Sequence, residues 1–142
     1  MNRPAIVILG PSAHELGTRI AQAIGGELHG YGPRVGDGVI PFTATAEHLR
    51  ELFAAGYPIV GLCAAGVLIR ALAPLLADKR DEPPVVAVAE DGSSVVPLLG
   101  GHHGANDLAK RIAEIVGGKA AITTAGDLRH GVALDARRAS SP

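Results

Sequence analysis

The sequence predicts an α/β fold: a three-layer α/β/α sandwich with a mostly parallel sheet and one antiparallel hairpin. Short apolar runs alternate with amphipathic segments of helical length, a pattern typical of repeated strand–helix units. The apolar runs are continuous, as expected of parallel strands that are buried on both faces. With two Tyr, two Phe and no Trp among 142 residues, the core must be built from Ala, Val, Leu and Ile, which suits close packing of helices on a sheet.

The first strand–helix unit starts with the apolar run 5–9, which ends at Gly10-Pro11. We expect Ser12 to be the N-cap of the following helix, because Glu15 three residues later would complete a capping box. The helix should end at Gly25-Gly26, since glycine commonly terminates helices.

The next segment predicts a short strand, a loop and a second helix. Residues 27–30 are assigned to the strand, and the stretch 31–37, which is rich in glycine, is assigned to an irregular loop. The second helix should begin at 43–45 and end at Gly56.

The stretch 58–77 is nearly all apolar and resembles a membrane span. Arg70 would then lie in the middle of the bilayer, where a charge is costly, and Pro74 would interrupt the helix. We therefore expect a buried strand over 58–62 and a buried helix over 67–76 that Pro74 shortens or bends.

The second half of the chain predicts the antiparallel hairpin. After a polar linker over 78–84, strands over 85–89 and 94–98 flank the turn sequence Asp91-Gly92. A long amphipathic helix should follow over 107–116.

The end of the chain predicts one more strand and a tail. Gly117-Gly118 should end the preceding helix, and the final strand should cover 120–124. Because a chain of this length normally forms one domain, we expect a single α/β domain over 1–130. Residues 131–142 are expected to form a loose C-terminal tail or the start of a linker.

The composition excludes several classes of partner. A formal net charge of −1 provides no basic field for nucleic acid, and scarce aromatics do not suit stacking on single strands. The single cysteine, Cys63, excludes an internal disulfide and a multi-cysteine metal cage. The apolar run near the start is too short for a signal peptide. We expect a cytoplasmic protein with no metal site, no cofactor, and no binding to membranes or nucleic acid.

Three loops contain the residues that most favour a ligand site: 63–66, 100–106 and 123–127. Each follows a predicted strand, and strand-to-helix loops of α/β folds gather where the strands end. We therefore expect one shared site. The loop 100–106 combines three glycines, two histidines and Asn106 before a helix N-terminus, which favours anions. The alternative is a plain strand-to-helix turn with surface histidines.

Two nucleotide-binding motifs are incomplete in this sequence. Residues 61–66 have the glycine spacing of a P-loop, but Val67-Leu68 stand where Lys and Ser or Thr hold the phosphates and the metal. The turn 10–17 does not match the G-x-G-x-x-G pattern of dinucleotide-binding folds.

Several side chains in these loops allow both a functional and a structural interpretation. His102 would serve as a general base because imidazole titrates near neutral pH, whereas the adjacent His103 would point away from it. Arg70 would either clamp a ligand carboxylate or form an ion pair. Cys63 would be either a nucleophile after a strand or an inert buried thiol. A last group would bind a ligand or cap the next turn: Thr123, Thr124 and Asp127.

Six segments between residues 58 and 127 occur in an order and spacing that match one protein family. They are 61–74, Lys79, 84–88, Asp91-Gly92, 98–109 and 122–127. The most specific part is the glycine–histidine–asparagine loop followed by the Thr-Thr strand. On these residues, about half of the chain resembles the N-terminal domain of the cobalamin-biosynthesis CbiG family.

The resemblance implies a role in making the corrin ring of vitamin B12. Full-length relatives are cobalt-precorrin-5A hydrolases, which open a lactone of the ring and release a two-carbon fragment as acetaldehyde. A similar domain is fused ahead of precorrin-3B C(17)-methyltransferase, and residues 125–135 look closest to that version. The implied partners are a corrinoid (precorrin) and other cobalamin-pathway enzymes, including such a methyltransferase domain. A homodimer is left open.

The resemblance also gives the candidate residues roles. His102 would activate the water that opens the lactone, and backbone N–H groups of the glycine loop would stabilise the oxyanion. The residues expected to bind the carboxylate-rich substrate are Gly66, Arg70, Gly100, Gly101, His103, Gly104, Asn106, Thr123, Thr124 and Asp127.

Other functions stay open on the sequence alone. The domain would bind a corrinoid without catalysis and transfer it to a methyltransferase, or it would be a structural domain that binds no tetrapyrrole. A flavodoxin-like flavin site over 12–18 is a further alternative, and the scarcity of aromatic residues counts against it.

Overall fold

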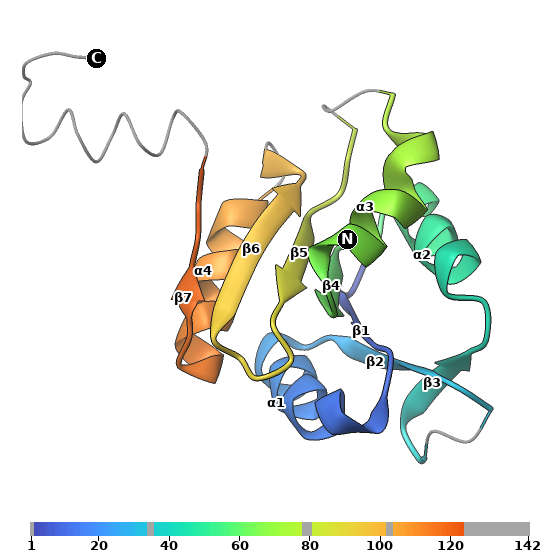
Figure 1. Cartoon of the computed structure of the whole chain (residues 1–142), viewed down its shortest axis with the longest axis horizontal. Helices are drawn as coiled ribbons and strands as arrows, with labels where there is room; N and C mark the ends of the chain where they lie inside the picture. The colour runs from blue at the N-terminus through green and yellow to red at the C-terminus, as the bar shows by residue number, and fades with distance from the viewer. Residues whose placement is uncertain (1, 34–35, 78–80, 102–103, 124–142) are drawn as a thin grey trace, which may run out of the picture.

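The computed structural model describes residues 2–33, 36–77, 81–101 and 104–123. In these residues, seven strands form one sheet in the order β3-β2-β1-β4-β5-β6-β7, and four α-helices pack on it (Figure 1). The predicted α/β sandwich is confirmed. The elements are β1 (Ala5–Ile8), η1 (Pro11–Ala13), α1 (His14–Ile24), β2 (Glu27–Tyr31), β3 (Val39–Phe42), α2 (Thr45–Ala54), β4 (Ile59–Leu62), α3 (Ala65–Leu72), η2 (Ala73–Leu75), β5 (Val85–Val88), β6 (Ser94–Leu99), α4 (Ala105–Val116) and β7 (Lys119–Ala120).

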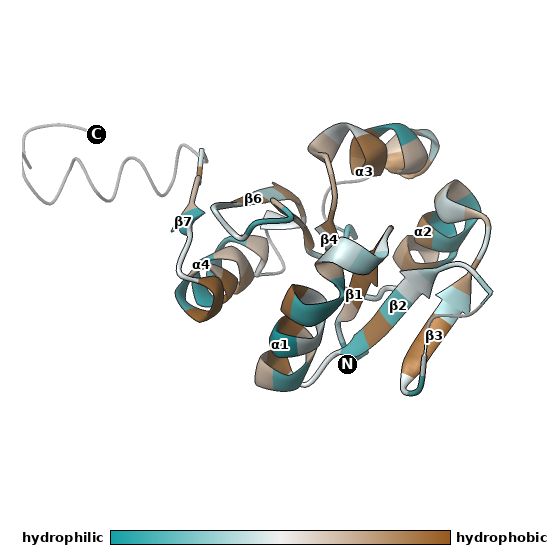
Figure 2. Cartoon of the chain, turned by 60° about the horizontal axis from the view of Figure 1, so that its bottom comes forward, coloured by the Kyte–Doolittle hydropathy of each residue, from teal (hydrophilic) through white to brown (hydrophobic). Residues whose placement is uncertain are grey.

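The helices form two layers, one on each face of the sheet. Figure 2 shows α2 and α3 on one side of the strands, and α1 and α4 on the other. Strand residues alternate between two apolar cores, so that Ile6 and Ile8 pack with α1 and α4, whereas Val7 packs with α2 and α3. Every residue of β1, β4 and β5 is buried. Burial on both faces explains why these runs contain no polar alternation.

Strand direction divides the sheet into two parts. Strands β1 to β5 are parallel to one another, β6 is antiparallel to β5, and β7 is parallel to β6. The β6–α4–β7 unit therefore runs opposite to the rest of the sheet. We call the edge where β6 and β7 end, at the top of the sheet in Figure 1, the upper edge, and the opposite edge, where β1 to β5 end, the lower edge.

Reciprocal arginine contacts join α1 and α4. Arg19 of α1 donates a hydrogen bond of 2.8 Å to the carbonyl of Ile115, and Arg111 of α4 donates one of 2.8 Å to the carbonyl of Ala23. Both acceptors lie in the last turn of a helix, where a cation is favourable. The crossed pairing requires the two helices to be antiparallel, in agreement with the reversed direction of the β6–α4–β7 unit.

The start of α1 differs from the prediction. Pro11–Ala13 forms the 3-10 helix η1, so Ser12 lies inside a turn, and Ala13 is the N-cap of α1 without a side-chain hydrogen bond. The capping-box prediction is therefore wrong. The fixed φ angle of Pro11 favours a helical turn before the residue that was expected to cap the helix.

Strand β3 was assigned to no element by the sequence. It lies at the edge of the sheet, pairs with β2, and contains Pro41. Proline is tolerated on an edge strand because only one side of the backbone needs hydrogen bonds.

The other boundaries agree with the prediction or shift by a few residues. Helix α3 begins at Ala65 rather than 67 and ends at Leu72, where η2 with Pro74 follows, so the predicted shortening is confirmed. Strand β7 covers only Lys119–Ala120. The segment 58–77 forms β4, α3 and η2, and no helix in the described residues is long and apolar enough to cross a membrane. The predicted tail, 131–142, lies outside the described residues.

Candidate functional site

The described parts of two of the three predicted loops lie at the upper edge. Strands β6 and β7 are parallel neighbours that pair Ser94 with Lys119 and Val95 with Ala120. The chain after β7 continues along β6, where the N–H of Ala121 donates to the carbonyl of Val95 at 2.9 Å, and runs toward the upper edge (Figure 1). The loop that follows β6 and the exposed Thr123 therefore lie on the same edge of the sheet.

The fold itself requires two of the three glycines in the loop after β6. Gly100 has a φ of +82°, and a Cβ there would collide with the backbone carbonyl of Pro83. Gly104 has a φ of +97° and is the N-cap of α4. Residues with a side chain rarely adopt such angles. These two glycines are explained by the close approach of two backbones and by the entry into the helix.

Gly101 is different, because nothing in the described structure requires a glycine there. Its φ is not positive, it is exposed, and no described atom outside its chain neighbours lies within 4 Å of the position that a Cβ would occupy. A glycine loses more chain entropy on folding than any other residue. A glycine that the fold does not need is a reason to look for a close approach from outside the chain.

The N-terminus of α4 opens beside Gly101. The N-cap, Gly104, forms no side-chain capping hydrogen bond, and the N–H of Ala105 donates to the carbonyl of Gly100 at 3.2 Å. Asn106 is half-buried in this turn, next to the exposed Asp107. A helix N-terminus presents backbone N–H groups and the positive end of the helix dipole. Four further predicted site residues lie outside the described residues: His102, His103, Thr124 and Asp127.

The third predicted loop lies at the opposite edge of the sheet. Residues 63–66 follow β4 at the lower edge, because the β5–β6 hairpin reverses the direction of the later strands. The expectation of one site shared by three loops is therefore wrong. Gly66 lies in the first turn of α3, and the exposed Arg70 folds over it, with Nη1 2.9 Å from the position of a Cβ on Gly66. The structure does not bring Gly66 or Arg70 to the upper edge.

The environment of Cys63 agrees with an inert thiol. Burial raises the pKa of the Cys63 thiol to about 11, and the nearby carboxylate of Glu90 adds to the increase. A thiol with such a pKa is almost fully protonated near neutral pH, and the protonated form is a poor nucleophile. Within the described part of the chain, no three His, Cys, Asp or Glu side chains are placed to hold a metal ion.

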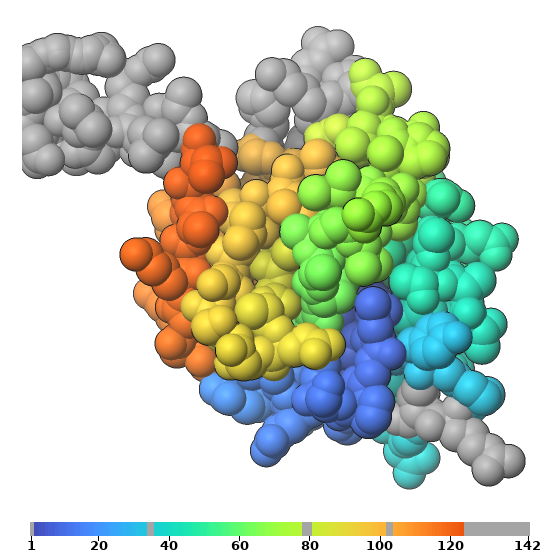
Figure 3. All heavy atoms as spheres, in the orientation of Figure 1, coloured from blue at the N-terminus to red at the C-terminus, as the bar shows by residue number. Residues whose placement is uncertain are grey.

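An apolar groove lies between α3 and β6, next to the upper edge. Its volume is about 190 Å³, and Leu99, one of its lining residues, directly precedes Gly100. In Figure 3, α3 (green) borders β6 (yellow to light orange) on the visible face. Ile69 on this face is 51% exposed and Leu76 is 39% exposed. This groove was not predicted from the sequence. One of its walls is the antiparallel strand β6, and the sequence alone did not indicate that β6 and the end of α3 lie side by side.

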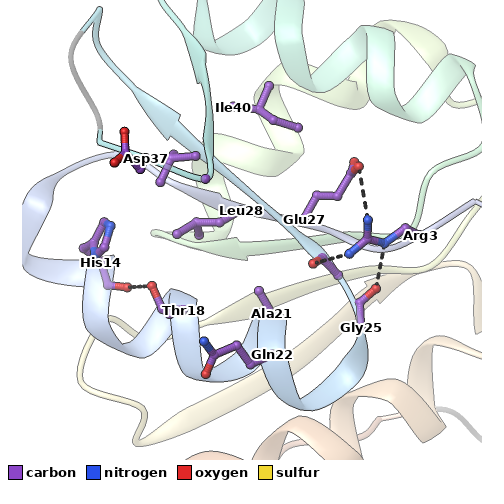
Figure 4. Close-up of a pocket in the computed structure, with 13 residues that line it drawn as sticks. Arg3, His14, Thr18, Ala21, Gln22, Gly25, Glu27, Leu28, Asp37 and Ile40 are labelled. Atoms are coloured by element: carbon purple, nitrogen blue, oxygen red, sulfur yellow. Dashed lines mark hydrogen bonds and ion pairs between the residues drawn. The ribbon is translucent and has the colours of Figure 1, made fainter.

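A larger and more polar groove runs along α1 and was also not identified from the sequence. It has a volume of about 600 Å³ and lies between α1, β2 and the start of β3. Figure 4 shows His14 and Asp37 at one end, and Arg3 with Glu27 at the other. The guanidinium of Arg3 already donates to the carbonyls of Gly25 and Gly26, at 3.0 and 3.1 Å. With acids and bases in balance, this groove does not favour a ligand rich in carboxylates.

Comparison with known proteins identifies the family. The family model described as "Cobalamin synthesis G N-terminal" matches residues 47–127. The chain belongs to the cobalamin synthesis G N-terminal family. The matched range contains the upper-edge loop, α3 and the apolar groove, and excludes the groove along α1.

The curated relatives of this family member are much longer proteins. A cobalt-precorrin-5A hydrolase of Salmonella typhimurium is 40% identical over 101 residues, which cover 70% of this chain and 29% of that protein. A cobalt-precorrin-5A hydrolase of Priestia megaterium is 33% identical over 88 residues, which cover 61% of this chain and 24% of that protein. The matched segments thus span 29% and 24% of the lengths of these relatives.

A solved structure supports the same fold. The crystal structure of a cobalamin biosynthesis protein G homolog from Sulfolobus solfataricus aligns with a TM-score of 0.64 and 22% sequence identity. The alignment covers 85% of this chain and 36% of that chain. At 22% identity the similarity shows that the two proteins share a fold. The chemistry of the cobalamin synthesis G N-terminal domain in this chain is therefore argued from its own residues.

Proposed function

We propose that this domain takes part in the hydrolysis of cobalt-precorrin-5A by holding the corrinoid at the upper edge of the sheet. The observation that carries the proposal is Gly101, an exposed glycine that the fold does not require, beside the N-terminus of α4, whose N-cap is also a glycine. Both features lie within the residues that match the family. The two curated relatives, which are named cobalt-precorrin-5A hydrolases, support the choice of substrate.

The chemistry of the upper edge suits a corrin precursor. Such a macrocycle has acetate and propionate carboxylates around an apolar ring. The N-terminus of α4 would receive a carboxylate, and the absence of a side chain at Gly101 would let it approach the backbone. The groove lined by Leu98 and Leu99 is too small for a whole macrocycle and would take an apolar part of its rim.

In this proposal His102 acts as the general base of lactone opening. It would take a proton from water as the oxygen adds to the lactone carbonyl, and return it to the ring oxygen as the C–O bond breaks. The products are an alcohol and a carboxylic acid, which loses its proton to solvent and becomes a carboxylate. Backbone N–H groups of the loop would stabilise the oxyanion. The remaining residues proposed to bind substrate at this edge are Gly100, His103, Gly104, Asn106, Thr123, Thr124 and Asp127.

A second function, binding without catalysis, is favoured by one observation. The chain matches only 29% and 24% of the lengths of the two relatives, so most of each relative lies outside the matched segment. In this case the domain would bind the corrinoid and present it to another catalytic domain, such as a methyltransferase.

The two functions are distinguished by measuring binding and turnover on the same protein. Corrinoid binding is followed by titration calorimetry, and turnover by acetaldehyde release from a lactone-bearing cobalt-precorrin. Binding with turnover that His102→Ala abolishes supports the hydrolase assignment, whereas binding without turnover supports the second function. No binding would contradict both.

A pair of variants locates the site. We expect Gly101→Leu to weaken corrinoid binding by about tenfold or more, because the side chain would fill the space through which the ligand approaches. Arg70→Ala serves as the matched control at the lower edge and should leave affinity unchanged. If Arg70→Ala weakened binding and Gly101→Leu did not, the site would instead lie at the lower edge. Thermal unfolding of both variants should match that of the wild type, since both positions are exposed.

A further inference from the structure

Two histidines form a direct contact between the sheet and α2. Nδ1 of His29 in β2 lies 2.8 Å from Nε2 of His48 in α2. His29 is 4% exposed, and His48 is half-buried. The ring of His48 stacks on Phe42 of β3, with centroids 4.5 Å apart and an angle of 5° between the planes. The pair therefore connects β2, β3 and α2 at one point.

The hydrogen bond between the two rings needs at least one neutral imidazole. One of the two facing nitrogens must donate a proton and the other must accept it. If both rings were protonated, both nitrogens would be N–H donors, and two positive charges would face each other across the same contact. The second nitrogen of His29, Nε2, is buried and has no hydrogen-bond partner among the described residues.

The charged groups around the pair do not compensate for a second proton. Glu27 of β2 has Oε1 3.8 Å from Nε2 of His29, and its other carboxylate oxygen is 3.6 Å from Arg3. Glu51 of α2 acts on His48. Burial lowers the pKa of His29, and His48 lowers it further against the opposite effect of Glu27. Burial also lowers the pKa of His48, against the opposite effect of Glu51.

We propose that the His29–His48 pair is a proton-sensitive contact that holds α2 and the edge strand β3 on the sheet when it is neutral and releases them when both rings are protonated. The contact is placed where release is easiest. Strand β3 is the last strand on its side of the sheet and pairs with β2, so its other side has no strand to hold it. Residues 45–54 would loosen together with β3.

The direction of the pH dependence follows from the preference for neutral rings. In the unfolded chain both histidines titrate near pH 6.5, whereas in the folded chain they resist protonation to lower pH. The unfolded chain therefore binds more protons as the pH falls below about 6.5. The contribution to stability is complete above that pH and decreases as the pH falls toward the lower values of the folded rings.

Ring titration by NMR tests the contact in the unmodified protein. We expect His29 and His48 to titrate below pH 6.5 and to influence each other. In His48→Gln, the titration of His29 should shift because its charged neighbour is gone. Two rings that titrate independently near pH 6.5 in the folded protein would overturn the proposal.

Denaturation at several pH values tests the consequence for the fold. For each additional proton bound by the unfolded chain, the unfolding equilibrium constant should rise about tenfold per pH unit between pH 6.5 and 5.5. This dependence should become weaker in His48→Gln and remain in the control His14→Gln. Amide exchange in the wild type should accelerate first in β3 and α2. The proposed release of β3 and α2 would be contradicted if the pH dependence of unfolding were equal in all three proteins. It would also be contradicted if amide exchange accelerated uniformly along the chain.

Discussion

At the scale of single residues, the structure separates glycines that serve the fold from a glycine that does not. Gly100 combines a φ of +82° with the close approach of the Pro83 carbonyl. We expect Gly100→Ala to lower the free energy of unfolding by more than about 2 kcal/mol, since a left-handed conformation alone costs about 1–2 kcal/mol for a residue with a side chain. Gly101→Ala should stay within about 0.5 kcal/mol of the wild type. Urea denaturation measures both, and equal losses would contradict this distinction.

The buried thiol supplies a second test at this scale. With a pKa of about 11, Cys63 should react with iodoacetamide at pH 8 about a hundredfold more slowly than an unperturbed cysteine with a pKa of about 8.5. The same protein in denaturant should react at the unperturbed rate, which controls for other effects of the sequence. A fast reaction of the folded protein would instead support the nucleophile interpretation of this residue.

At the scale of elements, one arginine is integrated into the helix packing and another is not. Arg50 of α2 donates from Nε to the carbonyl of Ala71, near the end of α3, at 2.9 Å. Removing a charged donor from a part-buried carbonyl should cost about 1–2 kcal/mol, so we expect Arg50→Met to lower the stability by that amount. Arg70→Met is the control on the exposed side of α3 and should have little effect. Thermal and urea unfolding of the two variants compare these costs, and similar losses would refute the role of Arg50.

The same scale shows which elements the sequence could predict. Strands β1, β4 and β5 were predicted because burial on both faces requires continuous apolar residues. Strand β3 was not, since its two middle residues, Ile40 and Pro41, are both exposed, so that the strand has neither this pattern nor a regular alternation. The start of α1 was misassigned because the capping-box pattern and Pro11 compete for the same turn. The local sequence alone does not decide between such competing signals, because the outcome depends on how the segment packs in the fold.

At the scale of the whole molecule, one hairpin determined how much of the site could be predicted. The sequence identified the Asp91-Gly92 turn, but the loops were placed as if all strands ended at one edge. Because the turn reverses the chain, β6 and β7 end at the upper edge and β4 ends at the lower edge. Gly100, Gly101 and Thr123 lie at the same edge of the sheet because β6 and β7 run in the same direction. Arg70 was grouped wrongly, since the direction of a strand is a property of the sheet and not of the local sequence.

Shortening the chain separates the fold from the proposed site at this largest scale. The described cores draw their residues from 5–120, so chains that end at residue 130 or at residue 123 should both unfold cooperatively at the temperature of the full chain. The chain 1–130 keeps Thr124 and Asp127 and should bind the corrinoid as the full chain does. The chain 1–123 lacks both and should bind it at least about tenfold more weakly. Calorimetry gives both quantities. If the chain 1–123 bound with full affinity, the residues after Thr123 would have no part in the site, and the proposal would reduce to the loop after β6, the N-terminus of α4 and Thr123.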